Sequence, residues 1–386
     1  MNLMACLSAF MVAGVTAAQE DPRLVERTRT VPVARLPLAV DWFEPTAPLA
    51  PSVSPLHLEH GPVNNPRLSE AIAIGDASRS TAVLVWQAGH MLLERYDDGA
   101  GPDTRTQSQS MHKSVLSLLV ALAMEDGLIK TLDAPVADYL GNWTPQPLGV
   151  IRLRHLLEMS SGLALPPPGE TGTEAFGNRL FNASDIAAVA RSAPQVKPPG
   201  TVFEYNNVNP QLLLAVLEAA TGEPYERYLS RRLWSRVAEA PGALWMDRPD
   251  GEPHGYCCLI ATARDWLRIG RLLLGDGGIL STAQRMALMA PTSTNPSYGR
   301  LIWRGSPWSK TRNYRPSGAF GVTHSAPYLA DDLVFFDGYG GQRVYVVPSR
   351  KLVIVRTGPV IADWDDAVLP NAVMRALAPD AGRKGK

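Results

Sequence analysis

The chain has 386 residues, of which 45% are hydrophobic and 19% are charged, and 37 basic residues balance 37 acidic ones. This length allows one large domain or two ordinary ones with a sizeable core, as in a soluble globular protein. A nucleic-acid or anionic-membrane surface normally carries a basic surplus, so the zero net charge argues against both partners. Lysine is scarce and occurs at positions 113, 130, 197, 310, 351, 384 and 386.

Residues 1–18 resemble a secretory signal peptide. They carry no charged side chain, contain a compact apolar run and end in small residues, although the usual basic n-region is absent. A disordered or mis-started N-terminus is the alternative. We therefore expect an exported protein, periplasmic or secreted, that loses about its first 18 residues. No later stretch offers about 20 uninterrupted apolar residues, so no transmembrane span is predicted.

The next segments in the chain predict an arm, a hairpin and a core helix. Residues 19–66 are rich in proline and lack periodicity, which indicates an extended N-terminal arm on the surface of the body. Residues 81–99 contain two β-type runs around a Gln-Ala-Gly-His turn, which predicts a hairpin. An apolar helix follows from about residue 110 and should end near Gly127.

The rest of the chain is helical first and strand-rich later. Residues 128–295 are mostly helical, 331–358 supply two or three strand-like runs, and a short helix near 364–378 closes the chain. Strands at both ends imply one antiparallel sheet built from N- and C-terminal segments, with the helical region inserted between them. The sequence thus predicts an α/β (α+β) fold, with one domain over residues 67–386.

Cysteine and histidine give little sign of a metal site or a disulfide framework. After removal of the signal, the remaining cysteines are the neighbours Cys257 and Cys258. Two small buried hydrophobic side chains are favoured there over a strained vicinal bridge. The seven histidines contain no His-Glu-x-x-His pattern, so we expect neither a metal nor another cofactor.

Ser110 and Lys113 lie three residues apart at the start of the apolar helix and therefore share a face. A serine hydroxyl is a poor nucleophile until a base takes its proton, and a lysine can be that base where burial depresses its pKa. The apolar stretch from Val115 to Met124 would provide this burial. Alone the pattern is weak, and the alternative is a helix-start serine beside an exposed lysine.

Two further stretches of the sequence favour a catalytic role for Ser110 and Lys113. Tyr205 and Asn207 lie in a loop introduced by proline and glycine, where a tyrosine hydroxyl can shuttle a proton and an asparagine amide can orient an amine or a carbonyl. Gly340 and Gly341 open a strand, so a substrate could lie against its edge and a backbone N–H near Gln342 could stabilise an oxyanion. A turn tyrosine and an ordinary β-bulge are the alternatives.

In this order, the three patterns resemble the serine β-lactamase and penicillin-binding-protein superfamily. The resemblance is closest to class C-like serine hydrolases, which include esterases of that fold and 6-aminohexanoate-oligomer hydrolases. It covers about residues 70–358. The stretches that carry it besides Ser-x-x-Lys are IRLRHLLEMSSGL (151–163), PPGTVFEYNN (198–207), ATARDWLRIGRLLL (261–274) and GYGGQRVYVVPSRKLVIV (338–355).

The resemblance implies a role for each matching residue. Ser110 would be the acylated nucleophile, Lys113 its general base, Tyr205 a proton-shuttling partner and Asn207 the third member of that loop. The backbone N–H groups of Ser110 and Gln342 would form the oxyanion hole.

One position departs from the family pattern. The third motif normally begins with lysine or histidine, and here Tyr339 takes that place, so a substrate carboxylate would lose its cation. The resemblance therefore implies hydrolysis of a small-molecule ester or amide. The alternatives are a β-lactamase or D-alanyl-D-alanine peptidase, and a catalytically idle ligand-binding relative. The chain has no Gly-x-Ser-x-Gly elbow, which argues against an α/β-hydrolase.

Overall fold

The computed structural model describes residues 22–59, 64–141, 143, 148–166, 172–173, 175–318 and 321–378. The expected signal peptide, residues 1–18, lies outside these described residues. Among the described helices, none is both long and apolar enough to cross a membrane.

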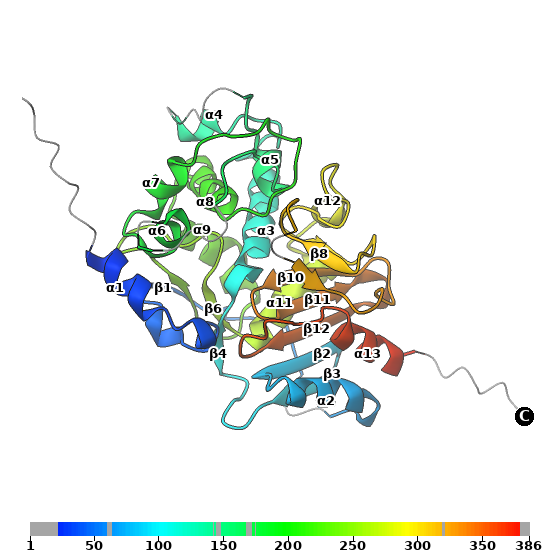
Figure 1. The fold of residues 1–386 in the computed structure, drawn as a ribbon. Helices are drawn as coiled ribbons and strands as arrows, with labels where there is room; N and C mark the ends of the chain where they lie inside the picture. The colour runs from blue at the N-terminus through cyan, green and yellow to red at the C-terminus, as the bar shows by residue number, and fades with distance from the viewer. Residues whose placement is uncertain are drawn as a thin grey trace, which may run out of the picture.

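The larger of two main sheets combines strands from both ends of the chain (Figure 1). Its strand order is β3-β2-β12-β11-β10-β7, and its neighbours run antiparallel. The strands are β2 (Ala82–Gln87), β3 (His90–Tyr96), β7 (Trp303–Arg304), β10 (Val334–Gly338), β11 (Gln342–Val347) and β12 (Leu352–Thr357). This confirms the predicted antiparallel sheet and its hairpin at 81–99.

Both faces of this sheet are covered, which explains why its central strands are apolar at successive positions rather than at alternate ones. Every residue of β11 and β12 is buried. On one face, α11 (Ala263–Arg271) packs against β2, β11 and β12. Elsewhere α2 (Ser69–Ala77) packs against β2 and against α13 (Val368–Ala376), the expected closing helix.

A second sheet, which the sequence did not predict, joins distant segments in the order β1-β5-β6-β4. Its strands are β1 (Thr46–Leu49), β4 (Arg105–Gln107), β5 (Gly242–Trp245) and β6 (Leu259–Thr262). The expected arm at 19–66 is therefore not extended throughout, because its described part holds β1 and the helix α1 (Pro22–Thr30). Phe43 and Leu49 from this segment are 0% and 1% exposed, so their burial attaches it to the core.

The helix α3 (His112–Glu125) passes through the centre of the molecule and packs against α8 (Val208–Thr221). Its residues 112–123 are all buried, which accounts for its lack of a polar face. It ends as predicted before Gly127, whose φ of 74° is readily adopted only by a residue without a side chain.

The helical lobe lies between the hairpin and the C-terminal strands in sequence, and beside the sheet in space (Figure 1). It contains α4 (Ala137–Leu140), α5 (Leu153–Leu157), α6 (Phe176–Asn182), α7 (Ile186–Arg191), α9 (Tyr225–Leu229) and α10 (Ser235–Val237). Outside it are α12 (Thr282–Met289) and the two-stranded ribbon of β8 (Thr311–Asn313) and β9 (Gly321–Thr323).

Candidate active site

The structure brings Ser110 and Lys113 into direct contact. Ser110 lies in a short 3-10 turn (Gln109–Met111) that leads into α3, and Lys113 lies in the first turn of that helix. The Lys113 Nζ is 2.7 Å from the Ser110 Oγ and 2.9 Å from the carbonyl oxygen of Tyr256. The lysine amine is thus held by a fixed acceptor on one side and faces the serine hydroxyl on the other.

Lys113 is only 1% exposed, so its ammonium form has lost nearly all of its hydration. Burial lowers the pKa of Lys113 from 10.5 to about 7, and the negative charge of Asp337 partly opposes this shift. The exposed lysine that the sequence left open as an alternative is therefore absent at this position. A large share of Lys113 is neutral near pH 7 and can accept a proton from Ser110.

Tyr205 lies in the loop that precedes α8, with its ring 4.7 Å from the Lys113 Nζ. Burial, followed by the nearby Tyr298 and Asp337, raises the pKa of Tyr205 well above 10, while a side-chain hydrogen bond with Ser110 opposes the rise. Tyr205 is consequently a neutral phenol near pH 7. It can donate or relay a proton, whereas Lys113 is the better acceptor.

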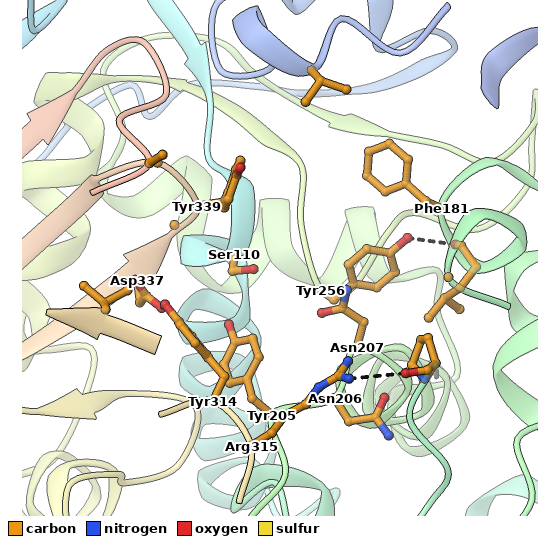
Figure 2. Close-up of a pocket in the computed structure, with 18 of the residues that line it drawn as sticks. Ser110, Phe181, Tyr205, Asn206, Asn207, Tyr256, Tyr314, Arg315, Asp337 and Tyr339 are labelled. Carbon is orange, nitrogen blue, oxygen red and sulfur yellow. Dashed lines mark hydrogen bonds between the residues drawn. The ribbon is translucent and has the colours of Figure 1, made fainter. Parts of the chain in front are cut away.

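The end of strand β10 forms the wall opposite Tyr205. In Figure 2, Ser110 lies between Tyr205 on one side and Tyr339 on the other. A Cβ atom added to Gly338 would lie 2.6 Å from the carbonyl oxygen of Ser108, so this close approach of strand and turn requires glycine. The backbone that follows Gly338 therefore lies directly beside the Ser110 turn.

The side chain of Gln342 belongs to the core, whereas the predicted oxyanion donor is its backbone N–H in the first position of β11. It is fully buried in β11, and it is not among the residues that line the pocket. Its side-chain amide donates to the carbonyl of Gly358 and accepts from the N–H of Gly358, both at 2.9 Å. Tyr339, Gly340 and Gly341 form the three-residue turn between β10 and β11 and line the pocket, so the predicted strand opens directly after the two glycines.

The two asparagines after Tyr205 have different environments. Asn207, the residue predicted to act, is exposed at the pocket and precedes the first residue of α8. Its neighbour Asn206 is buried and structural, because it donates to the carbonyls of Leu163 and Ala164 and accepts from the N–H of Val208.

The pocket itself has a volume of about 830 Å³. Ser110 and Tyr205 lie on its surface, together with aromatic and aliphatic side chains from several separate elements (Figure 2). Its other lining residues include Val31, Val33, Leu165, Leu180, Phe181, Tyr256, Tyr314, Arg315, Asp337, Ile361 and Trp364. A volume of this size accommodates a small molecule, and the mostly apolar lining suits one with substantial hydrocarbon surface.

A network of buried charges supports the β10 wall. Arg343 bridges Asp337 at 2.7 Å and Asp366 at 2.6 Å, and Arg312 bridges the same two carboxylates at 3.1 and 2.7 Å. Tyr314 donates its hydroxyl hydrogen to Asp337 at 2.5 Å. Burial alone would raise the pKa of Asp337, but the two arginines outweigh it and lower that pKa. Asp337 is therefore an anion beside the pocket.

Cys257 and Cys258 form a disulfide bond, which corrects the expectation of two separate hydrophobic side chains. They lie between Tyr256, whose carbonyl oxygen contacts Lys113, and strand β6. Their Cα atoms are 3.5 Å apart. Adjacent cysteines are seldom bridged because the intervening peptide must adopt an unusual conformation, so spacing alone favoured the wrong alternative.

Sequence reasoning missed Tyr256 and Asp337. Tyr256 acts through its backbone carbonyl, which no side-chain pattern reveals. Asp337 immediately precedes the glycine-rich turn and could have been considered on that ground, but its partner Arg312 comes from the separate ribbon strand β8. Among the described residues, no group of three or more histidine, cysteine or acidic side chains is placed to hold a metal ion.

The chain is similar to hydrolases of known name and to solved structures. The chain is 26% identical over 252 residues to the 6-aminohexanoate-dimer hydrolase of Paenarthrobacter ureafaciens, an alignment that covers 62% of each protein. The chain thus spans about three fifths of the length of that curated relative. A Bacillus anthracis structure assigned to the same hydrolases superposes with a TM-score of 0.69 at 20% identity, over 92% of this chain and 93% of the other.

A second solved structure gives the same result for the fold. EstCE1, a hydrolase with promiscuous acyltransferase activity, superposes with a TM-score of 0.62 at 18% identity, over 81% of this chain and 97% of its own. The Beta-lactamase family model matches residues 68–357, a region that contains Ser110, Lys113, Tyr205 and the β10 wall. On this match over most of its length, the chain belongs to the beta-lactamase family.

Proposed function

We propose that this beta-lactamase-family hydrolase cleaves an ester or small amide through an acyl-enzyme on Ser110. The observation that carries the proposal is the contact of 2.7 Å between the Ser110 hydroxyl and the amine of Lys113, in a site where burial lowers the pKa of that lysine to about 7. A serine next to a neutral amine is an activated nucleophile.

The reaction begins when neutral Lys113 accepts the proton of Ser110 and the serine oxygen attacks the substrate carbonyl. The resulting oxyanion needs backbone donors, and we assign these to the N–H groups of Ser110 and Gln342, because Gln342 pairs with Gly338, whose backbone lies against the turn that carries Ser110. Neutral Tyr205 relays the proton from Lys113 to the leaving alcohol or amine. A water molecule then hydrolyses the acyl-enzyme by the reverse proton path.

The preferred substrate is uncharged at the position next to Tyr339. This side chain is 53% exposed at the pocket and offers a ring and a neutral hydroxyl where relatives place a cation. A carboxylate bound there would lose a charge-assisted hydrogen bond, which is about twice as strong as a neutral one. Neutral short-chain acyl esters and amides make no such bond, so their binding is not weakened by a tyrosine in place of the cation.

The P. ureafaciens relative is named as a 6-aminohexanoate-dimer hydrolase and EstCE1 as a hydrolase with promiscuous acyltransferase activity, which supports an acyl-transfer reaction in this chain. β-Lactam or D-alanyl-D-alanine hydrolysis is the second candidate, because the matching family model is that of Beta-lactamase. A chromogenic short-chain ester and a chromogenic cephalosporin, assayed side by side, separate the two, and inertness toward both supports an idle ligand-binding relative.

A serine-directed fluorophosphonate, followed by peptide mass spectrometry, tests the nucleophile. Ser110 should carry the label, and Ser110→Ala should lose both labelling and turnover while remaining folded. Ser117→Ala is the matched control, since Ser117 lies two turns further along α3 and donates to the carbonyl of Ser114, away from the pocket. Labelling of a different serine would refute the assignment.

Export is a separate proposal that rests on the apolar, charge-free stretch at residues 1–18. N-terminal sequencing of the natively expressed protein should begin near residue 19. Retention of Met1 or Asn2 would contradict it.

A further inference from the structure

The segment that carries the disulfide is bonded three times to the segment that carries Ser110 and Lys113. The carbonyl oxygen of Tyr256 accepts from the Lys113 Nζ at 2.9 Å, and that of Cys257 lies 2.6 Å from the His112 Nδ1. The carbonyl oxygen of Leu259 accepts from the N–H of Ser108 at 2.9 Å. The carbonyls of Tyr256, Cys257 and Leu259 thus hold the turn and the first residues of α3 in place.

The disulfide lies in the middle of this run of carbonyls. It closes a small ring across the peptide between Cys257 and Cys258, and both residues are buried, at 5% and 0% exposed. Cys258 has a φ of 145°, a backbone conformation that residues with a side chain rarely adopt. The ring restricts this peptide, so the carbonyls on either side of it have fewer alternative directions.

The side chain of His112 adds a second anchor to the same segment. Its Nε2 is 2.8 Å from the hydroxyl of Tyr225, and burial lowers the pKa of His112 to about 4, so the ring is neutral. A neutral imidazole bonded on both nitrogens fixes the tautomer and links α9 to the disulfide segment through α3. The Tyr256 carbonyl that holds Lys113 therefore belongs to a packed set of contacts rather than to a free loop.

We propose that the Cys257–Cys258 disulfide is a positioning element of the site, which fixes the Tyr256 carbonyl so that the Lys113 amine points at Ser110. This inference rests on the proposed role of Lys113 as the base. The disulfide touches neither substrate nor reacting atoms, and it acts through the carbonyls of Tyr256 and Cys257. Without the ring, the peptide can rotate, the carbonyl leaves the amine, and Lys113 loses its fixed direction.

The groups that face Lys113 determine what loss of the ring does to its titration. They are the rings of Tyr205 and Tyr256, the imidazole of His112 and the carboxylate of Asp337. Burial is the largest influence on this lysine, and the wall at Tyr256 provides part of it. A loosened wall admits water, so the pKa of Lys113 should move up toward its usual value.

The first experiment establishes the bond in the full-length protein. Alkylation before and after unfolding, with intact-mass measurement, should find no free thiol at either cysteine until a reductant is added. Dithiothreitol supplies two electrons and two protons to the bridge, yields two cysteine thiols and itself becomes a cyclic disulfide. Free thiols at both positions in the oxidised, active enzyme would overturn the proposal at once.

The second experiment compares Cys257→Ala, Cys258→Ala and the double variant. Each single change opens the same ring, so all three should show the same decrease in kcat, about tenfold to a hundredfold, which is the scale for a displaced catalytic group. KM should change little, and the acid limb of the kcat profile should move to higher pH. Reduced wild-type enzyme should behave as the double variant does.

Val353→Ala is the matched control, because it truncates a buried side chain in β12 away from the pocket. It should lower the melting temperature and leave the acid limb unchanged. Cysteine variants that retain the kcat and the acid limb of an enzyme still labelled at Ser110 would refute this proposal and leave the proposed function intact. Loss of Ser110 labelling in the wild type would instead refute the proposed function.

Discussion

Lys113 and Arg343 are both buried cations beside the same pocket, with 1% and 2% of their surface exposed, yet burial has opposite consequences for their charge. Lys113 contacts a hydroxyl and a carbonyl, and its pKa falls to about 7. Arg343 contacts two carboxylates, and despite burial its pKa rises above the usual value. The partners of a buried cation therefore decide whether it becomes a base or a fixed charge.

The contrast assigns different tasks to the two walls of the pocket. The α3 wall supplies a group that can exchange a proton near pH 7, whereas the β10 wall supplies ions whose charge does not change in that range. Asp337 connects the two, because it is held by the arginines and also raises the pKa of Lys113 against the effect of burial.

Replacing Lys113, the cation that titrates near pH 7, should have the largest effect on kcat. Lys113→Arg keeps a positive charge that cannot be lost near neutral pH, so it removes the base while preserving a buried cation. We expect kcat to fall by about 10²–10⁴-fold, the usual contribution of a general base, and Lys113→Ala to be equally inactive. Steady-state kinetics on a chromogenic ester measures this, and an active Lys113→Arg enzyme would exclude Lys113 as the base.

Breaking the buried network of arginines and carboxylates behind the β10 wall should mainly reduce stability. Asp366→Asn removes one of the two carboxylates shared by Arg312 and Arg343, and Asp366 does not line the pocket. Leaving buried charges without a partner costs about 3–5 kcal/mol of unfolding free energy. Denaturant unfolding at pH 7 measures the loss. An unchanged midpoint would show that the network contributes little, whereas folded Asp366→Asn enzyme should keep most of its turnover.

The connection between the two walls can be tested through pH. In the wild type, activity should rise with pH through about 7, because neutral Lys113 is the active form. The anion of Asp337 favours the protonated lysine, so Asp337→Asn should move this acid limb to lower pH. A shift to higher pH would contradict the assigned electrostatic direction. The kcat profile should be measured on protein shown to be folded, since this variant also weakens the network.

Substrate preference should show the smallest effect. Tyr339→Lys restores a cation at the pocket rim and should raise the efficiency ratio of a carboxylate-bearing β-lactam to a neutral ester by about tenfold, or roughly 1–2 kcal/mol. Competition between the two substrates measures this ratio directly. A wild-type enzyme that already prefers the cephalosporin would refute the substrate proposal without affecting the nucleophile.

Much of this architecture follows from local pattern. The apolar α3, the hairpin and the C-terminal strands have strong periodicity, so the antiparallel sheet and its inserted helical region were predicted correctly. The proximity of Ser110 and Lys113 was predicted from their spacing of three residues, but the spacing alone left an exposed lysine open, and their proposed roles came from the family resemblance. The direction of the lysine pKa shift followed from the same helix.

What could not be predicted depends on contacts between distant segments. The second sheet joins β1 to β5, whose residues are some 200 positions apart along the chain, and neither strand is long enough to show a clear pattern. The bonds of the Gln342 side chain with Gly358 also join the ends of separate strands, so no local pattern reveals them. The disulfide was missed because its formation depends on the backbone at Cys258 rather than on spacing.

The position of β12 in the large sheet has a consequence for biosynthesis. This strand lies between β2 and β11, so the N-terminal hairpin gains its neighbour only after residue 357 has been made. Until then β2 presents an unpaired, apolar edge that can associate with other chains. Pairing across this separation is also slow, because the chain must lose the conformational entropy of closing a long loop before the stabilising contacts form. A nascent chain should therefore need a holding factor for β2, and translation stopped before Leu352 should give insoluble protein.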